Sequence, residues 1–262
     1  MNLAIIGGGN LGKALAVGLV QSKNFTYKQI IVTRRNRQHI EDLVDRGIEV
    51  STDNVDAVRR SDIVVVAVKP HQIEKVLEEI RADLDPMRHI LISVVTGFSI
   101  ERIKDIVGSV PTCRAMPNTA ISIHESMTCL SVEGLSDEQR ELVVKLFDAV
   151  GRAVVINEEL MGAATVLAAC GIAYALRYLR ASAQGGVEIG FGADLAQLIA
   201  AQTMKGAAQL VLEGGLHPEQ EIDKVTTPRG VTISGLNEME HRGFSSALIK
   251  GLVVSHDKIS RL

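Results

Sequence analysis

The sequence predicts an α/β fold in which an N-terminal, Rossmann-like doubly wound sheet is followed by an all-α C-terminal domain. Short apolar runs alternate with helical patterns through the first half of the chain, which is typical of a parallel sheet with helices on both faces. A glycine-rich loop follows the first apolar run, as in dinucleotide-binding units. No convincing strand pattern remains after about residue 158, so we predict domains over residues 1–157 and 158–262.

The predicted strands are short runs rich in β-branched residues. The fourth is an unbroken apolar run, which indicates a strand buried on both faces. In order, the predicted strands cover residues 3–6, 30–33, 47–50, 62–68, 89–94, 112–115, 127–132 and 153–155. The predicted helices between them cover residues 11–21, 37–45, 72–83, 100–106 and 136–150. The last of these begins with Ser136 and Gln139, which have the spacing of a capping box.

The C-terminal part is predicted to be helical throughout, and its first helix is unusually apolar. The predicted helices cover residues 160–184, 193–213, 218–224, 231–242 and 243–261. Residues 160–176 carry no charge, but a membrane-spanning helix needs about 20 strongly apolar residues. A small helical domain offers few partners to cover such a helix. We therefore expect a dimerisation domain that forms a homodimer or a larger oligomer built from dimers.

Composition excludes several classes of function. The chain has 262 residues, of which 46% are hydrophobic, 23% charged and 3% aromatic, and its formal net charge is −3. This balance gives no general attraction for nucleic acid or for an anionic membrane. The three cysteines, Cys113, Cys129 and Cys170, lack any metal-ligand spacing, so we expect no metal site and interpret them as small apolar residues in a reducing compartment. A strand beginning directly after Met1 leaves no room for a signal peptide, and we expect a cytoplasmic protein.

The glycine-rich loop predicts a nicotinamide dinucleotide site. Such a loop needs glycine for a tight turn, for close approach to the pyrophosphate and for packing of the helix on the strand. The N-terminus of the following helix favours anions. An ordinary glycine-rich turn between strand and helix is the alternative interpretation. The cofactor-binding residues expected here are Ile6, Gly7, Gly9, Asn10, Leu11 and Gly12.

The end of the second strand bears on the choice of cofactor. An NAD enzyme usually has a carboxylate there, whereas this chain reads Thr33-Arg34-Arg35-Asn36. Two guanidinium groups suit a 2′-phosphate, so we favour NADP(H) over NAD(H). The alternative is that one or both arginines are merely solvated. Lys69 follows the fourth strand and could serve the nicotinamide ribose or the substrate, or lie on the surface.

Four ordered motifs carry a resemblance to a known family. They are Ile5-Ile6-Gly7-Gly8-Gly9-Asn10-Leu11-Gly12, Ala67-Val68-Lys69-Pro70, Arg114-Ala115-Met116-Pro117-Asn118 and Thr226-Thr227-Pro228-Arg229-Gly230-Val231-Thr232. Over essentially its whole length the chain resembles the pyrroline-5-carboxylate reductases. The resemblance implies an enzyme that transfers hydride from NADPH to the imine carbon of 1-pyrroline-5-carboxylate, giving L-proline. It also implies cofactor contacts from Asn54, Ala67, Val68, Lys69, Pro70, Val94 and Asn118.

The resemblance places the substrate carboxylate at Gly230, Val231 and Thr232, and Arg229 stands next to them. Free backbone N–H groups at the start of a helix can bind a carboxylate without a cation. Since no paired acid and base stand out, Thr232 is the candidate catalytic residue, contacting the ring nitrogen; its alternative role is to cap the helix. We expect His71 and His124 to be surface residues.

Two departures from the family pattern fall in the substrate half. Where the family has Ser-Gly-Ser-Gly-Pro-Ala-Tyr, this chain has Ala168-Ala169-Cys170-Gly171-Ile172-Ala173-Tyr174, and Arg229 replaces a glycine. Without proline, the helix should be straighter and more continuous. Two alternatives stay open: a reductase of a different cyclic imine or keto acid on the same fold, and a non-catalytic NADP-binding regulatory protein.

Overall fold

The computed structural model describes residues 1–22 and 29–259. It divides into two compact units, of which the first is Met1–Cys170 together with the chain from His256, and the second is Gly171–Ser255. The first unit contains the sheet and the second is helical, which confirms the predicted α/β fold with a helical C-terminal part. The domain boundary between residues 157 and 158 stays a prediction.

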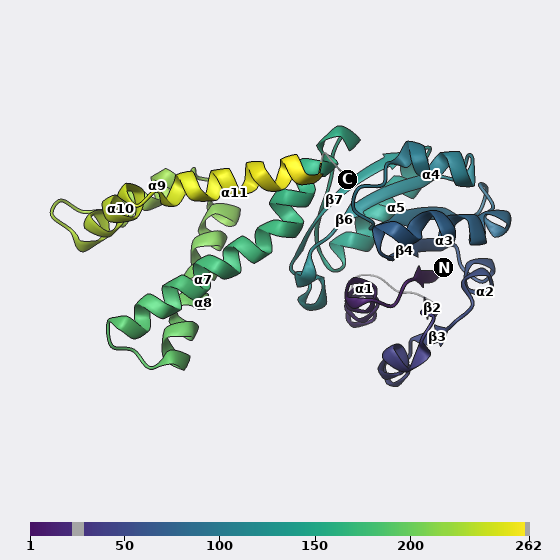
Figure 1. Ribbon diagram of the computed structural model, residues 1–262, viewed down its shortest axis with the longest axis horizontal. Helices are drawn as coiled ribbons and strands as arrows, with labels where there is room; N and C mark the ends of the chain where they lie inside the picture. The colour runs from purple at the N-terminus through teal and green to yellow at the C-terminus, as the bar shows by residue number, and fades with distance from the viewer. Residues whose placement is uncertain (23–28, 260–262) are drawn as a thin grey trace. The chain divides into compact units, whose positions relative to one another are not determined.

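The sheet has the strand order β3-β2-β1-β4-β5-β6-β7-β8 (Figure 1). Its strands are β1 Asn2–Ile6, β2 Gln29–Thr33, β3 Glu49–Ser51, β4 Ile63–Val66, β5 Ile90–Ser93, β6 Thr112–Met116, β7 Ser126–Glu133 and β8 Gly151–Val155. The order reverses between β1 and β4, and open α/β sheets bind ligands at that point, beyond the carboxyl ends of the strands.

One strand pair departs from the predicted parallel arrangement. β7 runs antiparallel to β6, whereas the other neighbouring pairs are parallel. The cause is the connection between them, because only the short 3₁₀ helix η4, Thr119–Ile123, separates these strands. A parallel crossover needs a dozen or more residues, and the chain therefore turns back.

Helices follow most strands, as the alternating pattern predicts. In the first unit they are α1 Asn10–Gln21, η1 Arg37–Arg46, α2 Asn54–Arg59, η2 Pro70–Gln72, α3 Ile73–Ile80, η3 Arg81–Asp83, α4 Ile100–Val107, α5 Asp137–Asp148, η5 Glu158–Leu160, α6 Met161–Ala164 and the π-helix η6 Thr165–Cys170. The predicted capping box is present, since Ser136 Oγ accepts from the backbone of Gln139, whose side chain accepts from Ser136 N. The helix predicted over residues 37–45 is a 3₁₀ helix, and α2 is an element that the sequence pattern did not reveal.

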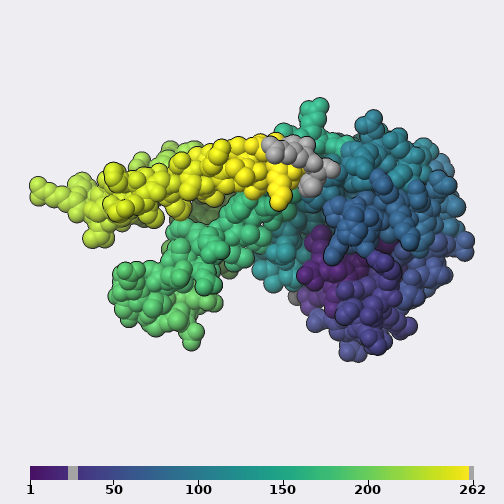
Figure 2. Space-filling model, viewed as in Figure 1, coloured from purple at the N-terminus to yellow at the C-terminus, as the bar shows by residue number. Residues whose placement is uncertain are grey.

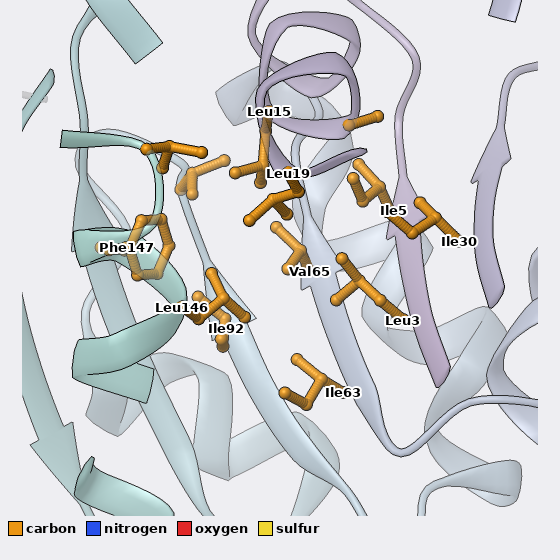
Figure 3. Close-up of a cluster of buried hydrophobic side chains, with 14 of the residues drawn as sticks. Leu3, Ile5, Leu15, Leu19, Ile30, Ile63, Val65, Ile92, Leu146 and Phe147 are labelled. Atoms are coloured by element: carbon orange, nitrogen blue, oxygen red, sulfur yellow. The ribbon is translucent and has the colours of Figure 1, made fainter. Parts of the chain in front are cut away.

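Successive residues of the central strands enter two separate hydrophobic clusters on the two faces of the sheet. Leu3 and Ile5 of β1 lie in one cluster with residues of α1, η1 and α5, as Figure 3 shows for part of it. Ala4 and Ile6 lie in the other cluster, with residues of α2, α3 and α4. Because both faces are covered, β4 is apolar at every position, as the sequence predicts.

The second unit consists of α7 Gly171–Glu188, α8 Ala193–Gly214, α9 Pro218–Lys224, α10 Val231–His241 and most of α11 Phe244–Ile259. α7 and α8 pack side by side (Figure 1), and α11, in yellow, lies open along the surface of this unit (Figure 2). Large apolar side chains are exposed on these helices, among them Leu198 at 64% and Leu212 at 62%. Such surface is typical of a face that another protein covers.

Residues 158–188 form one uninterrupted helical run, but the run is not regular. By length and composition alone it could cross a membrane, and 17% of its most apolar window is buried; the exposed apolar face also suits a subunit interface. With Ile172 in place of the family's proline we expected a continuous helix, and the helical run passes this position without a break. Instead of a regular α-helix, however, Thr165–Cys170 adopts π-helical geometry, which widens the turn and is frequent at functional sites.

Candidate active site

A cavity of about 980 Å³ opens where the strand order reverses, at the carboxyl ends of β1, β2, β3 and β4. Nine of its lining residues are predicted cofactor contacts, namely Ile6, Gly7, Gly9, Arg34, Arg35, Asn54, Ala67, Val68 and Lys69. The sequence reasoning did not assign the others, which are Gly8, Thr33, Asn36, His39, Thr52, His71, Gln72, Lys75, Val76 and Glu79. The structure thus brings four separate strand ends together around one cavity.

The glycines of the loop divide into two kinds. Gly7 has φ +116°, and a Cβ there would lie 2.4 Å from the carbonyl oxygen of Ala67. A Cβ at Gly12 would lie 2.1 Å from the carbonyl oxygen of Gly7. These two positions need glycine for the fold itself. A Cβ at Gly9 would meet nothing within 4 Å, so packing within the protein does not require this glycine, whereas a ligand lying against the loop would.

Helix α1 begins at this open position without a cap. Gly9 is its N-cap residue, and no side chain accepts from the first turn, which also has no acidic residue. The first N–H groups of a helix have no partner within it, and they carry the positive end of the helix dipole. The first turn, Asn10, Leu11 and Gly12, therefore offers backbone donors for a phosphate, although these three residues do not themselves line the cavity.

Cationic side chains outnumber acidic ones around the cavity. Arg34, Arg35, Lys69 and Lys75 line it together with one carboxylate, Glu79. Arg34 is half-buried, and its Nη1 donates to the carbonyl oxygen of Gly8 at 2.7 Å. Arg35 is exposed. One guanidinium is thus fixed against the glycine loop and the second is available beside it, an arrangement that attracts phosphate.

A hydrogen-bonded row of three side chains forms another wall. The Thr33 hydroxyl donates to Asn54 Oδ1 at 2.6 Å, and Asn54 Nδ2 lies 3.2 Å from each carboxylate oxygen of Glu79. The carbonyl oxygen of Thr33 also accepts from Gly7 N and Gly8 N, at 3.1 and 2.7 Å. The row therefore connects the glycine loop to α3.

The residues that sequence reasoning missed carry a recognisable signal. Gln72, Lys75, Val76 and Glu79 follow the i, i+3, i+4, i+7 spacing, which places them on one face of a helix. Their mainly polar character marks that face as open to a solvent-filled or ligand-filled space. His71 is exposed, as expected, and lies at the cavity. His124 is half-buried, and its Nε2 lies 2.8 Å from the carbonyl oxygen of Gly18.

Besides Asn10, Leu11 and Gly12, three more predicted cofactor residues do not line this cavity. Pro70 begins η2, and Val94 is 6% exposed in the first of the two hydrophobic clusters. Asn118 has both polar side-chain atoms engaged, because Oδ1 accepts from Ala120 N at 3.0 Å and Nδ2 donates to Ala168 O at 3.2 Å. Asn118 therefore ties the end of β6 to the π-helix.

The predicted substrate residues lie at the N-terminus of α10, in the second unit. Gly230 is the N-cap residue, no side chain caps the helix, and Gly230 N donates to Thr227 O at 2.9 Å. Val231 and Thr232 are exposed. Arg229 has φ +60°, a left-handed conformation that glycine adopts without strain. The segment thus presents free first-turn donors next to a strained arginine.

In the part of the chain that the structure describes, the cysteines and the potential metal ligands add no further reactive group to the site. Burial raises the pKa of the Cys113 thiol, and Cys129 is also buried and has a raised pKa for the same reason; both act as small apolar residues. Cys170 is half-buried. Within residues 1–22 and 29–259, no three His, Cys, Asp or Glu side chains are grouped so that they could hold a metal ion.

Comparisons with known proteins match both parts of the chain. Residues 158–262 match the family described as pyrroline-5-carboxylate reductase dimerisation, and residues 2–97 match the family described as NADP oxidoreductase, coenzyme F420-dependent. These matches identify an NAD(P)-binding oxidoreductase domain and a dimerisation domain.

Relatives that align with nearly the whole chain point to the same family as the match over residues 158–262. Pyrroline-5-carboxylate reductase 1 of Dictyostelium discoideum is 50% identical over 99% of this chain, which spans only 49% of that longer protein. Pyrroline-5-carboxylate reductase 2 of the same organism is 43% identical, with 99% of this chain and 92% of the relative covered. The structure of a pyrroline-5-carboxylate reductase from Coxiella burnetii has a TM-score of 0.90 and 29% identity, over 99% of this chain and 97% of that one. The chain therefore belongs to the pyrroline-5-carboxylate reductase family.

Proposed function

We propose that this chain reduces 1-pyrroline-5-carboxylate with NADPH and forms L-proline, the last step of proline biosynthesis. Family membership supports the reaction class, an oxidoreductase acting on a C=N bond. When bound, NADPH supplies the hydride that the imine carbon accepts. The observation that carries the cofactor assignment is Gly9, the loop position whose missing side chain no protein contact requires.

The cofactor residues we propose are those of the loop and the neighbouring strand ends. The uncapped start of α1 suits the pyrophosphate. Arg34 and Arg35 at the end of β2 favour a 2′-phosphate, and thus NADP(H) over NAD(H). Asn54, Val94 and Asn118 remain proposed contacts, as do the backbone segments at residues 10–12 and 67–70.

For the substrate, we propose the N-terminus of α10. Gly230, Val231 and Thr232 remain the proposed substrate contacts. Because the Gly230 N–H already donates to Thr227 O, the N–H groups of Val231 and Thr232 are the ones that can hold the carboxylate, and Arg229 adds a cation beside them. The Thr232 hydroxyl is the group proposed to contact the ring nitrogen. Thr232→Ala should then lower kcat/KM; a change within about twofold, which is less than about 1 kcal/mol, would contradict this role.

The proposed assembly is a homodimer formed through residues 158–262, in a cytoplasmic enzyme. The dimerisation family match and the apolar surface of the second unit support it. No nucleic acid or membrane partner is proposed. The same residues would form the substrate and dimerisation domain, with residues 1–157 as the NADP-binding domain.

The test is turnover by the purified full chain. NADPH oxidation is followed by absorbance, first with 1-pyrroline-5-carboxylate and then with a panel of cyclic imines and keto acids. We expect 1-pyrroline-5-carboxylate to give the highest kcat/KM. Faster reduction of another imine or keto acid would show that the chain is a reductase of a different substrate on the same fold. NADPH binding without turnover on any compound would favour a non-catalytic binding protein.

A further inference from the structure

The cofactor cavity contains a carboxylate that its proposed ligand does not require. Glu79 lies on the exposed side of α3 and lines the cavity with four cationic side chains. The other acidic residues near it in sequence, Glu74 and Glu78, do not line the cavity. A carboxylate in a cavity that binds phosphates opposes their charge, so phosphate binding alone does not account for Glu79.

Hydrogen bonds hold this carboxylate to the end of β2. Because Thr33 donates to Asn54 Oδ1 at 2.6 Å, the Asn54 side chain turns its Nδ2 to Glu79. Both oxygens of Glu79 accept at 3.2 Å. Thr33 is the last residue of β2 and is 1% exposed, so the row is anchored in the core.

A carboxylate at the end of β2 affects which coenzyme a dinucleotide-binding sheet prefers. In dinucleotide-binding sheets an Asp or Glu there accepts hydrogen bonds from the adenosine ribose and disfavours a 2′-phosphate. In this chain that strand end carries Arg34 and Arg35, but the fold brings a carboxylate back to the same wall from α3. The cavity therefore combines arginines, which favour NADP(H), with a carboxylate, which favours NAD(H).

We propose that Glu79 limits the preference for NADPH. Its carboxylate weakens binding of the 2′-phosphate of NADPH and supports the free ribose hydroxyl of NADH, so that the site accepts both coenzymes. This inference rests on the proposed function, since it assumes that the cavity binds the adenosine half of a nicotinamide coenzyme. In this proposal Arg34 and Arg35 make the site prefer NADPH to NADH, and Glu79 reduces the size of that preference.

The test uses two substitutions at Glu79. Glu79→Gln removes the charge but keeps an oxygen that can accept from Asn54, whereas Glu79→Ala removes both. Glu78→Gln is the matched control, because Glu78 is the exposed neighbour outside the cavity. Dissociation constants for NADPH and NADH are measured on each full-length variant by fluorescence titration, at low and high salt.

A charge pair at about 4 Å in water is worth about fivefold in an equilibrium constant. We expect Glu79→Gln to tighten NADPH binding about fivefold and to weaken NADH binding, so that the ratio of the two constants shifts about tenfold. The gain for NADPH should shrink at high salt, because exposed charges are screened. Glu78→Gln should leave both constants unchanged.

Two results would overturn the inference while the proposed function stands. In the first, the wild-type chain binds both coenzymes, and the dissociation constants of Glu79→Gln for NADPH and NADH equal those of the Glu78→Gln control. The other is a shift seen only in Glu79→Ala, which would mean that Glu79 acts by holding Asn54 and not through its charge. If the wild-type chain binds neither coenzyme, the proposed function itself fails.

Discussion

The side-chain amide of Asn118 donates to the backbone carbonyl of Ala168, with 3.2 Å between Nδ2 and O. The acceptor lies inside the π-helix Thr165–Cys170, so a residue at the end of β6 holds the irregular turn of the long helical run. Asn118 Oδ1 accepts from Ala120 N at the same time. The side chain thus caps η4 and joins its start to the π-helix, and these bonds give it a structural role that does not depend on the cofactor.

Replacing Asn118 by alanine should therefore cost stability more than cofactor affinity. Both backbone partners lose a hydrogen bond, and we expect a loss of about 1–3 kcal/mol in the free energy of unfolding, measured by urea denaturation. Ser122→Ala on the neighbouring 3₁₀ helix is the control. If stability is unchanged while the dissociation constant for NADPH rises about tenfold, which is about 1.4 kcal/mol, Asn118 acts through direct cofactor contact, as the family resemblance implies.

The loop glycines offer a pair of variants with opposite expected effects. Gly9→Ala should leave stability unchanged and weaken NADPH binding at least about tenfold, because the added methyl group enters space that only the ligand would fill. Gly12→Ala should destabilise the fold by about 1–3 kcal/mol, because its Cβ would overlap the carbonyl of Gly7. Thermal unfolding and NADPH titration of both variants check this contrast. Unimpaired NADPH binding by Gly9→Ala would remove the loop from the proposed site.

The arginine at position 229 combines backbone strain with charge. Arg229→Gly relieves the left-handed strain and should stabilise the chain by about 1 kcal/mol, whereas Arg229→Ala keeps the strain and removes the guanidinium. If the cation binds the substrate carboxylate, both variants should raise KM with little change in kcat. Equal stability of the two variants would show that position 229 is not strained in solution. An unchanged KM in both would show that the guanidinium faces solvent.

A partly buried ion pair anchors the start of the helical run. Glu158 Oε1 accepts from Arg114 Nη1 at 2.8 Å and from Ile100 N at 2.7 Å, and the Arg114 side chain is only 10% exposed. Glu158→Gln leaves the Arg114 guanidinium without its counter-charge. Because the Glu158 side chain is 30% exposed, we expect a loss of about 1–3 kcal/mol in stability. The control is Glu159→Gln, an exposed neighbour. A partner substitution, Arg114→Met, should recover part of the loss in the double variant; full additivity of the two losses would contradict the coupling.

The sheet could be predicted from the sequence because its central strands are buried on both faces. A short run of β-branched residues without a polar position, such as residues 63–66, is typical of such a strand. The antiparallel β7 was missed because hydrophobicity does not encode strand direction; the length of the connection does. The π-helix was missed because its partner Asn118 lies 50 positions away from the acceptor Ala168.

The sequence predicted those cofactor-site residues that directly follow a strand, because the ends of the strands could be located from the hydrophobic pattern. Loop and strand-end residues such as Gly9, Arg34 and Lys69 follow their strands closely in sequence. Glu79 lies on a helix that the sequence pattern predicts correctly, but its closeness to Asn54 depends on how α3 packs against the sheet. Tertiary packing decides that contact, and no local pattern indicates it.

The most direct test of the central claim is a labelled turnover. The purified chain is incubated with 1-pyrroline-5-carboxylate and NADPH that carries deuterium at both C4 positions, and the proline formed is analysed by mass spectrometry and NMR. Hydride transfer to the imine carbon predicts L-proline with one deuterium, located on the ring carbon that bonds to nitrogen and carries no carboxylate. Absence of proline, or proline without deuterium, would contradict the assignment of this chain as an NADPH-dependent imine reductase.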